Sequence, residues 1–308
     1  MQHLAFARPG RFWRGNLHTH SDRSDGVLPV AEVCRRYETA GYDFLCVSDH
    51  LIGRYAYPIS DTTPCRTNRF TTILGAEVHT GALANGELWH LLAVGLPADF
   101  APPDQPGFEP VEGAESAGVL AARCAEAGAF VALAHPEWYG LTPEDARTVG
   151  AAHAVEVYNH TCHLHAARGY GTGLWDVLLN EGRRITACAS DDAHFAGPDQ
   201  FGGWVMVRAE ANEPEALVEA LRAGAYYATQ GPELRDVRVE GGEVLVECSP
   251  VERVVVLGAR SASGGAHGRA MTRAAVPLSH RLAKGGWIRV SVDDAAGRRA
   301  WSNPLWLS

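Results

Sequence analysis

The sequence lacks paired cysteines and long apolar runs. Its seven cysteines are odd in number and never spaced as C-x-x-C, which indicates reduced, largely buried thiols rather than disulfides or a thiolate metal site. No segment reaches the roughly 20 apolar residues that a membrane span requires. The first residues show no long apolar run after a basic start, so no signal peptide is expected. We therefore expect a cytoplasmic protein with no membrane partner.

Positive charge is also scarce, because 27 lysines and arginines stand against 36 aspartates and glutamates and give a net charge of −9. Sequence-independent binding of nucleic acid needs clustered basic residues, so a nucleic-acid polymer is not an expected partner. A small phosphorylated substrate is compatible with this charge if bound metal ions reverse the local field. The 308 residues suffice for a large domain and a small one, and the oligomeric state is not predicted.

Short apolar strands alternate with helical segments over about the first 230 residues. The expected helices cover residues 29–41, 117–127, 173–181 and 214–223, and the expected strands cover residues 44–48, 130–134, 154–158 and 185–189. Strands separated by helices are typical of parallel β-α-β units, so the fold class is α/β, as a sheet or a barrel. The proline-rich residues 101–110 are expected to form a surface loop.

The pattern changes near residue 232. Valines alternate on both sides of Gly241 and Gly242, which predicts a β-hairpin, and residues 287–292 are expected to pair with residues 299–306. The expected domains are therefore residues 1–231 and a small all-β domain of residues 232–308.

Histidines and carboxylates gather near the ends of the predicted strands. In GNLHTHSDRSDG, residues 15–26, His18 and His20 alternate along an extended chain, so both can point at one spot. The carboxyl ends of barrel strands gather at one rim, where active sites lie. Histidines and carboxylates suit catalytic Zn, Mn or Fe ions, and this inventory is enough for two or three. The other candidates at strand ends are His50, Glu77, His135, Asp192 and His194.

The motifs HTHSDRSDG, VSDH, GAE, WHLLAVGL, AHP, VEVYN and SDDAH occur in this order, and the series resembles the PHP family, the polymerase and histidinol phosphatase domain. The resemblance implies a distorted seven-stranded β/α barrel, TIM-like in form, with up to three metal ions at the rim. The tail, which ends in SNPLWL, is similar to the small, sandwich-like β domain of carbaryl-hydrolase-like relatives.

The resemblance also implies three sets of ligands. The first metal would be held by His18, His20, Glu77 and Asp192. The second would be held by Glu77, His90 and His135. The third would be held by Asp25, His50 and His194. In ASDDAH, keeping the one-residue gap before His194 selects Asp192 as the ligand and turns Asp191 toward a supporting hydrogen bond.

The predicted function is a metal-dependent hydrolase, a phosphoesterase acting on a small-molecule phosphate ester. A metal-bound water can lose its proton near pH 7 and supply hydroxide, while neighbouring metals neutralise charge on the substrate oxygens. The candidate catalytic residues are Glu77, Asp192 and His194. The candidate substrate contacts are Arg54, Arg66, Arg69, Trp138, Asn159 and His160.

Several roles stay open at this stage. His79 shares a face with Glu77 but is expected not to be a ligand, because His90 fills that role. Glu156 is either a ligand or a supporting partner, and Asp49 is expected to be structural or to orient His50 as a supporting partner. In the run NHTCHLH, residues 159–165, surface or pocket-wall histidines are expected rather than a metal tract.

Two other functions also stay open. The same metal centre suits a carboxyl ester or a carbamate, for which Trp89, Trp138 and Tyr139 would provide aromatic surroundings. A noncatalytic, metal-binding accessory module is the second alternative. The physiological substrate and the identity of the metal are not predicted.

Overall fold

The computed structural model describes residues 1–307. The helices are α1 (Leu4–Ala7), α2 (Val30–Thr39), the 3-10 turns η1 (Gly53–Tyr55) and η2 (Thr63–Cys65), α3 (Ala117–Glu126), α4 (Pro143–Thr148), α5 (His160–Ala166), α6 (Thr172–Asn180), α7 (Pro214–Ala223) and α8 (His280–Lys284). The strands are β1 (Arg11–Asn16), β2 (Phe44–Val47), β3 (His50–Leu51), β4 (Thr71–Ala82), β5 (Leu88–Val94), β6 (Phe130–Leu133), β7 (Ala154–Asn159), β8 (Thr186–Ser190), β9 (Trp204–Ala209), β10 (Tyr226–Thr229), β11 (Leu234–Glu240), β12 (Glu243–Gly258), β13 (Ser263–Pro277), β14 (Trp287–Asp293), β15 (Arg299–Ser302) and β16 (Leu305–Trp306).

The predicted helices and strands of residues 1–231 are all present, with ends within two residues of those expected. The strand expected over residues 299–306 is divided into β15 and β16, which both pair with β14. Local signals account for this agreement. Helix α7, for example, has Pro214 at its first position, where the missing N–H costs nothing, and Gly224 just after its end with a φ of 79°. The α/β fold class is confirmed.

Seven strands follow one another in the order β1-β2-β4-β5-β6-β7-β8. Strands β1, β2 and β4 are parallel, and so are β6, β7 and β8. Strand β5, which was not among the predicted strands, is antiparallel to both β4 and β6. No helix lies between β4 and β5, and a connection as short as residues 83–87 permits only antiparallel pairing.

The sheet is open at one side of this series. Among the described strands, no hydrogen-bonded ladder joins β8 to β1 or to β9, and β9 instead pairs antiparallel with β1 and β10. A closed TIM-like barrel is therefore not confirmed. No helix within residues 1–307 is both long and apolar enough to cross a membrane.

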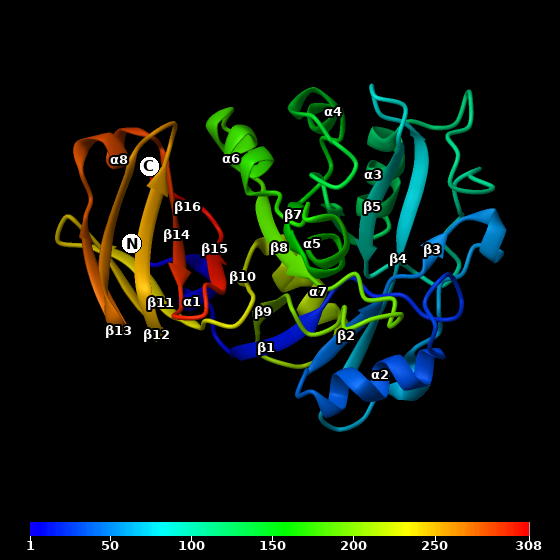
Figure 1. Ribbon diagram of the computed structural model, residues 1–308, viewed down its shortest axis with the longest axis horizontal. Helices are drawn as coiled ribbons and strands as arrows, with labels where there is room; N and C mark the ends of the chain where they lie inside the picture. Colours follow the sequence, from blue (N-terminus) through cyan, green and yellow to red (C-terminus); the bar gives the residue numbers. More distant parts are fainter. Residues whose placement is uncertain (308) are drawn as a thin grey trace.

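The C-terminal strands extend the same sheet to one side of the molecule (Figure 1). The hairpin of β11 and β12 turns at Gly241 and Gly242, and β14 pairs with β15, both as predicted. Strand β15 also pairs with β10, so the sheet is continuous across residue 232. A separate sandwich-like domain is not confirmed, and the boundary between residues 231 and 232 stays a prediction.

Candidate metal centre

Glu77 is the residue around which the centre is built. Its side chain is buried, and its two oxygens face different histidines. Oε1 lies 2.7 Å from Nδ1 of His90 and 3.1 Å from Nε2 of His135. Oε2 lies 2.8 Å from Nδ1 of His50 and 3.5 Å from Nε2 of His18. Glu77 thus presents one oxygen to each of two clusters of imidazoles.

The expectation that Glu77 lies at a strand end is wrong. Strand β4 continues beyond Glu77 to Ala82 in order to form its hairpin with β5, and residue 77 lies in its middle. The short strand β3 pairs with this extension, with His50 opposite Glu77 in the register. His90 reaches the centre from near the start of β5, because this strand runs in the opposite direction.

The loops after β1 and β8 supply a second cluster. Nε2 of His18 lies 3.1 Å and Nε2 of His20 lies 3.0 Å from Oδ1 of Asp192. A β-bridge between Thr19 and Ala193 holds the two loops side by side. The backbone of Asp192 has a φ of 58°, a left-handed conformation that aspartate tolerates better than most residues do.

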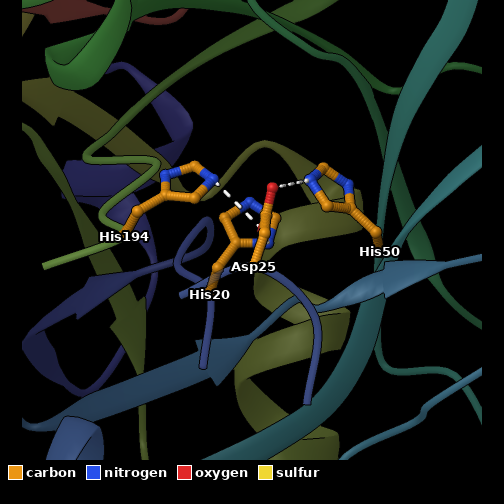
Figure 2. A group of neighbouring side chains, drawn as sticks. All are labelled: His20, Asp25, His50 and His194. Atoms are coloured by element: carbon orange, nitrogen blue, oxygen red, sulfur yellow. Dashed lines mark ion pairs between the residues drawn. The ribbon is translucent and has the colours of Figure 1, made fainter. Parts of the chain in front are cut away.

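Asp25 lies among three histidines that form a third cluster: His20 from its own loop, His50 from β3 and His194 from the loop after β8 (Figure 2). Its oxygens lie 3.3 Å from Nε2 of His50, 3.4 Å from Nε2 of His194 and 3.8 Å from Nδ1 of His20. His20 therefore connects the second and third clusters, because its other ring nitrogen faces Asp192. This position of His20 was not expected for the third site.

The structure brings all nine predicted ligands together. Four groups have potential ligand atoms within 4.8 Å of one another: His20, Asp25, His50 and His194; His18, Glu77 and His135; His18, His20 and Asp192; and His50, Glu77 and His79. Within residues 1–307, His90 belongs to none of these groups, although it contacts Glu77 directly. The division of these residues among three metal ions stays a prediction.

Glu156 forms hydrogen bonds with two of the predicted ligands and with their neighbours. Its Oε1 accepts hydrogen bonds from Nδ1 of His18, at 3.0 Å, and from the hydroxyl of Ser190. Its Oε2 accepts from the backbone N–H of His135, at 2.7 Å, and from the amide of Asn159, at 3.0 Å. All four contacts hold neighbours in place, so Glu156 acts as a supporting partner.

Asp191 and Asp49 also support the loops. Asp191 points away from the centre, as expected, and accepts hydrogen bonds from Asn16, Tyr37 and the backbone N–H groups of residues 201–203. Burial raises the pKa of Asp191 to about 6. Of the two roles expected for Asp49, its contacts favour the structural one: it accepts hydrogen bonds from Ser21, Ser24 and Ser60 and so fixes the loop that carries His20 and Asp25.

Opposite charges dominate the electrostatics of the centre. Burial alone would lower the pKa of each histidine, but Glu77 and Asp25 raise the pKa of His50 to about 10, and Asp25 with Asp192 raises that of His194 to about 9. Burial likewise disfavours the ionised carboxylates, yet the surrounding histidines lower the pKa of Glu77 and Asp192. The carboxylates are therefore ionised at neutral pH and attract positive charge.

The donor set fits divalent metal ions. Among the described residues, Nε2 of His18, Oε2 of Glu77 and Nδ1 of His135 are buried without a hydrogen-bond partner. An unpaired buried polar group costs about 1–3 kcal/mol, a cost that a coordinated cation would remove. Imidazole nitrogens and carboxylate oxygens are the donors that Zn, Mn and Fe accept.

A cavity of about 380 Å³ opens over the centre. Its apolar lining residues include Leu88, Phe108 and Trp138, of which Trp138 is 41% exposed. None of the described lining residues is lysine or arginine. The lining consists of Asp25, His50, Glu77, Glu87, Leu88, His90, Phe108, His135, Trp138, Thr161, Cys162, His165, Ala166, Asp192 and His194.

No protein-family model and no curated protein matches this chain. Among solved structures, a two-domain protein from Bacteroides vulgatus that contains a predicted PHP-like metal-dependent phosphoesterase aligns over 96% of this chain and 95% of its own, with 18% identity and a TM-score of 0.53. The fold is PHP-like. At this identity the similarity shows the fold alone, and the carbaryl-hydrolase-like branch is not confirmed.

Two further structures align over less of the chain. An amidohydrolase from Chromobacterium violaceum with bound sulfate covers 60% of this chain and 89% of its own, with 14% identity and a TM-score of 0.46. A lesion-specific endonuclease from Pyrococcus furiosus covers 69% of this chain and 56% of its own, with 16% identity and a TM-score of 0.47.

In this PHP-like fold, Trp138 alone of the six candidate substrate contacts lines the cavity. Arg66 donates to the side chain and carbonyl of Thr72, near the start of β4, and Arg54 and Arg69 are exposed outside the cavity. Asn159 is fully buried behind Asp192, and His160 is hydrogen-bonded to Tyr158. Arginines are common in polar loops, and a loop sequence does not show whether such a side chain points toward the cavity or toward solvent.

Sequence reasoning missed Phe108, which lies on the proline-rich segment of residues 101–110. Its ring is 4.9 Å from that of His50, so this segment forms part of the cavity wall rather than a surface loop alone. The aromatic residue in an otherwise polar, proline-rich segment was the one available signal. Helix α5 contributes Thr161 and His165 to the opposite wall, in agreement with the expected pocket-wall histidines.

Proposed function

We propose that this chain is a metal-dependent phosphoesterase that hydrolyses a small-molecule phosphate ester. The observation that best supports the proposal is the buried carboxylate of Glu77, whose Oε2 has no hydrogen-bond donor among the described residues although three histidine rings lie within 3.6 Å of it. Such an arrangement is favourable around cations and unfavourable without them.

The proposed ligands divide as the sequence implies, with one addition. His18, His20, Glu77 and Asp192 would hold one ion; Glu77, His90 and His135 a second; and Asp25, His50 and His194, joined by His20, a third. Zn, Mn and Fe ions are the proposed cofactors. When bound, such ions acidify a water molecule for attack near neutral pH and stabilise negative charge on the substrate.

The protein's own residues would prepare this centre. Glu77 and Asp192, which stay ionised at neutral pH, would bind the ions, and Glu156 accepts the Nδ1–H of His18 and so leaves Nε2 free to coordinate. His194, on the cavity wall, faces the substrate side of the centre. Trp138 would stack on the substrate and exclude water.

We also propose the finer assignments that accompany this function. Residues 1–231 would form a distorted seven-stranded barrel that contains the metal centre, and residues 232–308 a small all-β domain. The seven cysteines are free and favour a reducing compartment such as the cytoplasm. A small phosphorylated molecule is the proposed partner.

The test is to strip the protein of metal, reload it separately with Zn²⁺, Mn²⁺ or Fe²⁺, and measure hydrolysis of 4-nitrophenyl phosphate and bis(4-nitrophenyl) phosphate. We expect turnover in the reloaded protein and its loss in Glu77→Gln. The matched control is Glu181→Gln, which makes the same chemical change at a surface carboxylate paired with Arg147. Loaded protein that hydrolyses neither phosphate would overturn the proposal.

One observation favours hydrolysis of a carboxyl ester or carbamate as a second candidate function. The cavity wall is aromatic at Phe108 and Trp138 and, among the described lining residues, contains no lysine or arginine for a phosphate. A neutral aromatic substrate suits such a wall. A higher kcat/KM for 4-nitrophenyl acetate or an aryl carbamate than for the aryl phosphates would select this reading. Loaded protein without any turnover would instead indicate an accessory metal-binding module.

A further inference from the structure

We propose that His79 is a positioning residue that determines which ring nitrogen of His50 faces the metal centre. The inference rests on the proposed metal-binding function. It concerns a residue that was expected not to be a ligand and that has no part in the mechanism described above.

His79 lies two residues after Glu77 on β4, so both side chains point to the same face of the strand. It is completely buried. Its Nδ1 lies 3.1 Å from the backbone carbonyl of Trp89 on β5, and its Nε2 lies 2.9 Å from Nδ1 of His50. The ring therefore connects the backbone of the neighbouring strand with a proposed ligand.

The chemistry of these contacts fixes the position of each proton. A carbonyl oxygen can only accept, so Nδ1 of His79 donates to Trp89. Full burial of His79 favours its neutral ring. The carboxylate oxygen of Glu77 is 3.9 Å from Nε2, too far to accept a hydrogen bond from a charged ring. A neutral ring with its proton on Nδ1 has an acceptor at Nε2, and this acceptor faces His50.

His50 must then donate from Nδ1. Oε2 of Glu77 lies 2.8 Å from the same nitrogen but is not aligned to accept its hydrogen, so the hydrogen bond of Nδ1 is the one with His79. With one proton held on Nδ1, Nε2 is the nitrogen whose proton an incoming ion would displace. This nitrogen lies 3.3 Å from Asp25, in the cluster proposed for the third ion (Figure 2).

Two substitutions separate the two hydrogen bonds of His79. In His79→Gln the amide reaches the place of Nε2, so its oxygen can still accept from His50. In His79→Asn the amide reaches only the place of Nδ1, so the contact with Trp89 can persist while the acceptor for His50 is lost. Both variants bury an amide of similar polarity, which makes each the control for the other.

The experiment titrates Zn²⁺ into the stripped wild-type protein and both variants by calorimetry and records ¹⁵N shifts of the histidine rings in the zinc-loaded forms. In the wild type and in His79→Gln, we expect His50 to bind zinc through Nε2 with a protonated Nδ1. In His79→Asn, we expect one zinc ion to bind about 10–100-fold more weakly, the usual effect of removing a hydrogen-bond partner of a ligand, while the other ions bind as before.

If the wild-type protein binds zinc, three results would overturn the inference: wild-type zinc affinity in both variants, an equal loss in both, or ring shifts that show zinc on His79 itself. The last result is the direct alternative, since His50, Glu77 and His79 have potential ligand atoms within 4.8 Å of one another. A wild-type protein that binds zinc in this way without hydrolysing phosphate esters would refute the proposed function and leave the inference standing. Absence of zinc binding would refute both.

Discussion

Replacing Glu156 with glutamine tests whether the support beneath the metal centre sets its metal affinity. The carboxylate accepts from His18 and Ser190 at one oxygen and from His135 and Asn159 at the other. Glutamine has one oxygen and one NH₂ group. The NH₂ group cannot accept, so one of the two pairs of donors loses its acceptor. The substitution leaves the size of the side chain unchanged.

The two orientations of the amide have different costs. An NH₂ group opposite the backbone N–H of His135 and the amide of Asn159 would meet two groups that cannot accept. Opposite Ser190 and His18 the conflict can be relieved, because a hydroxyl rotates and an imidazole can move its proton to Nε2. The second orientation is therefore favoured, and it places a proton on the nitrogen of His18 that lies 3.1 Å from Asp192.

The expected loss follows from this shift. A protonated Nε2 cannot coordinate, so the ion held by His18 should bind about 10–100-fold more weakly, which corresponds to about 1.4–2.7 kcal/mol. The assay is calorimetric titration of Zn²⁺ into stripped protein, with hydrolysis of 4-nitrophenyl phosphate measured in parallel. Glu181→Gln, the same change at an exposed ion pair, should leave both unchanged. Wild-type zinc affinity in Glu156→Gln would refute the reasoning.

Three further outcomes are expected. His20→Ala and Asp192→Ala should each lose at least one ion per chain by elemental analysis and nearly all turnover, and full activity in either would reject the ligand assignment. Trp138→Ala should raise KM for aryl esters about 2–10-fold with little change in kcat, as the loss of one aromatic contact predicts, whereas an unchanged KM would remove Trp138 from the substrate wall. Burial lowers the pKa of His3 to about 4 from 6.5, so the unfolded chain binds the proton first as the pH falls. The contribution of His3 to the free energy of unfolding should therefore fall by about 3 kcal/mol between pH 6.5 and pH 4. Urea unfolding at a series of pH values measures it, and in His3→Gln the free energy of unfolding should fall less steeply over this range.

Local patterns predicted part of the candidate site, and the resemblance to the PHP family supplied the division of the ligands. His18 and His20 could be assigned to one face because alternation along an extended chain is a local property. The resemblance supplied the one-residue gap in ASDDAH that selected Asp192 and turned Asp191 away, and the contacts of both residues agree with that choice. The strand and helix ends followed from similar short-range signals, such as Pro214 and Gly224 around α7.

Features that depend on pairing across the sheet could not be predicted in this way. The reversed direction of β5 places His90 at the centre from the start of its strand, and the contact between His79 and the carbonyl of Trp89 exists only in that register. Strand β13 has a single buried residue, Val276, so burial imposes no apolar alternation on its sequence, and the strand is recognisable only from its pairing with β12. Phe108 reaches the cavity through a long loop whose path no periodicity encodes.

The buried carboxylates themselves distinguish supporting residues from ligands. Asp191 accepts from Asn16, Tyr37 and three backbone N–H groups, and Glu156 accepts from four donors, so neither has an oxygen left unsatisfied. Glu77 is buried as deeply but faces only imidazole rings, and its Oε2 has no donor within the described chain. A buried charge without hydrogen-bond donors is stable only when other positive charge compensates it. All oxygens of Asp191 and Glu156 thus accept hydrogen bonds, whereas one oxygen of Glu77 accepts none. This difference makes Glu77 the buried carboxylate most suited to bind cations.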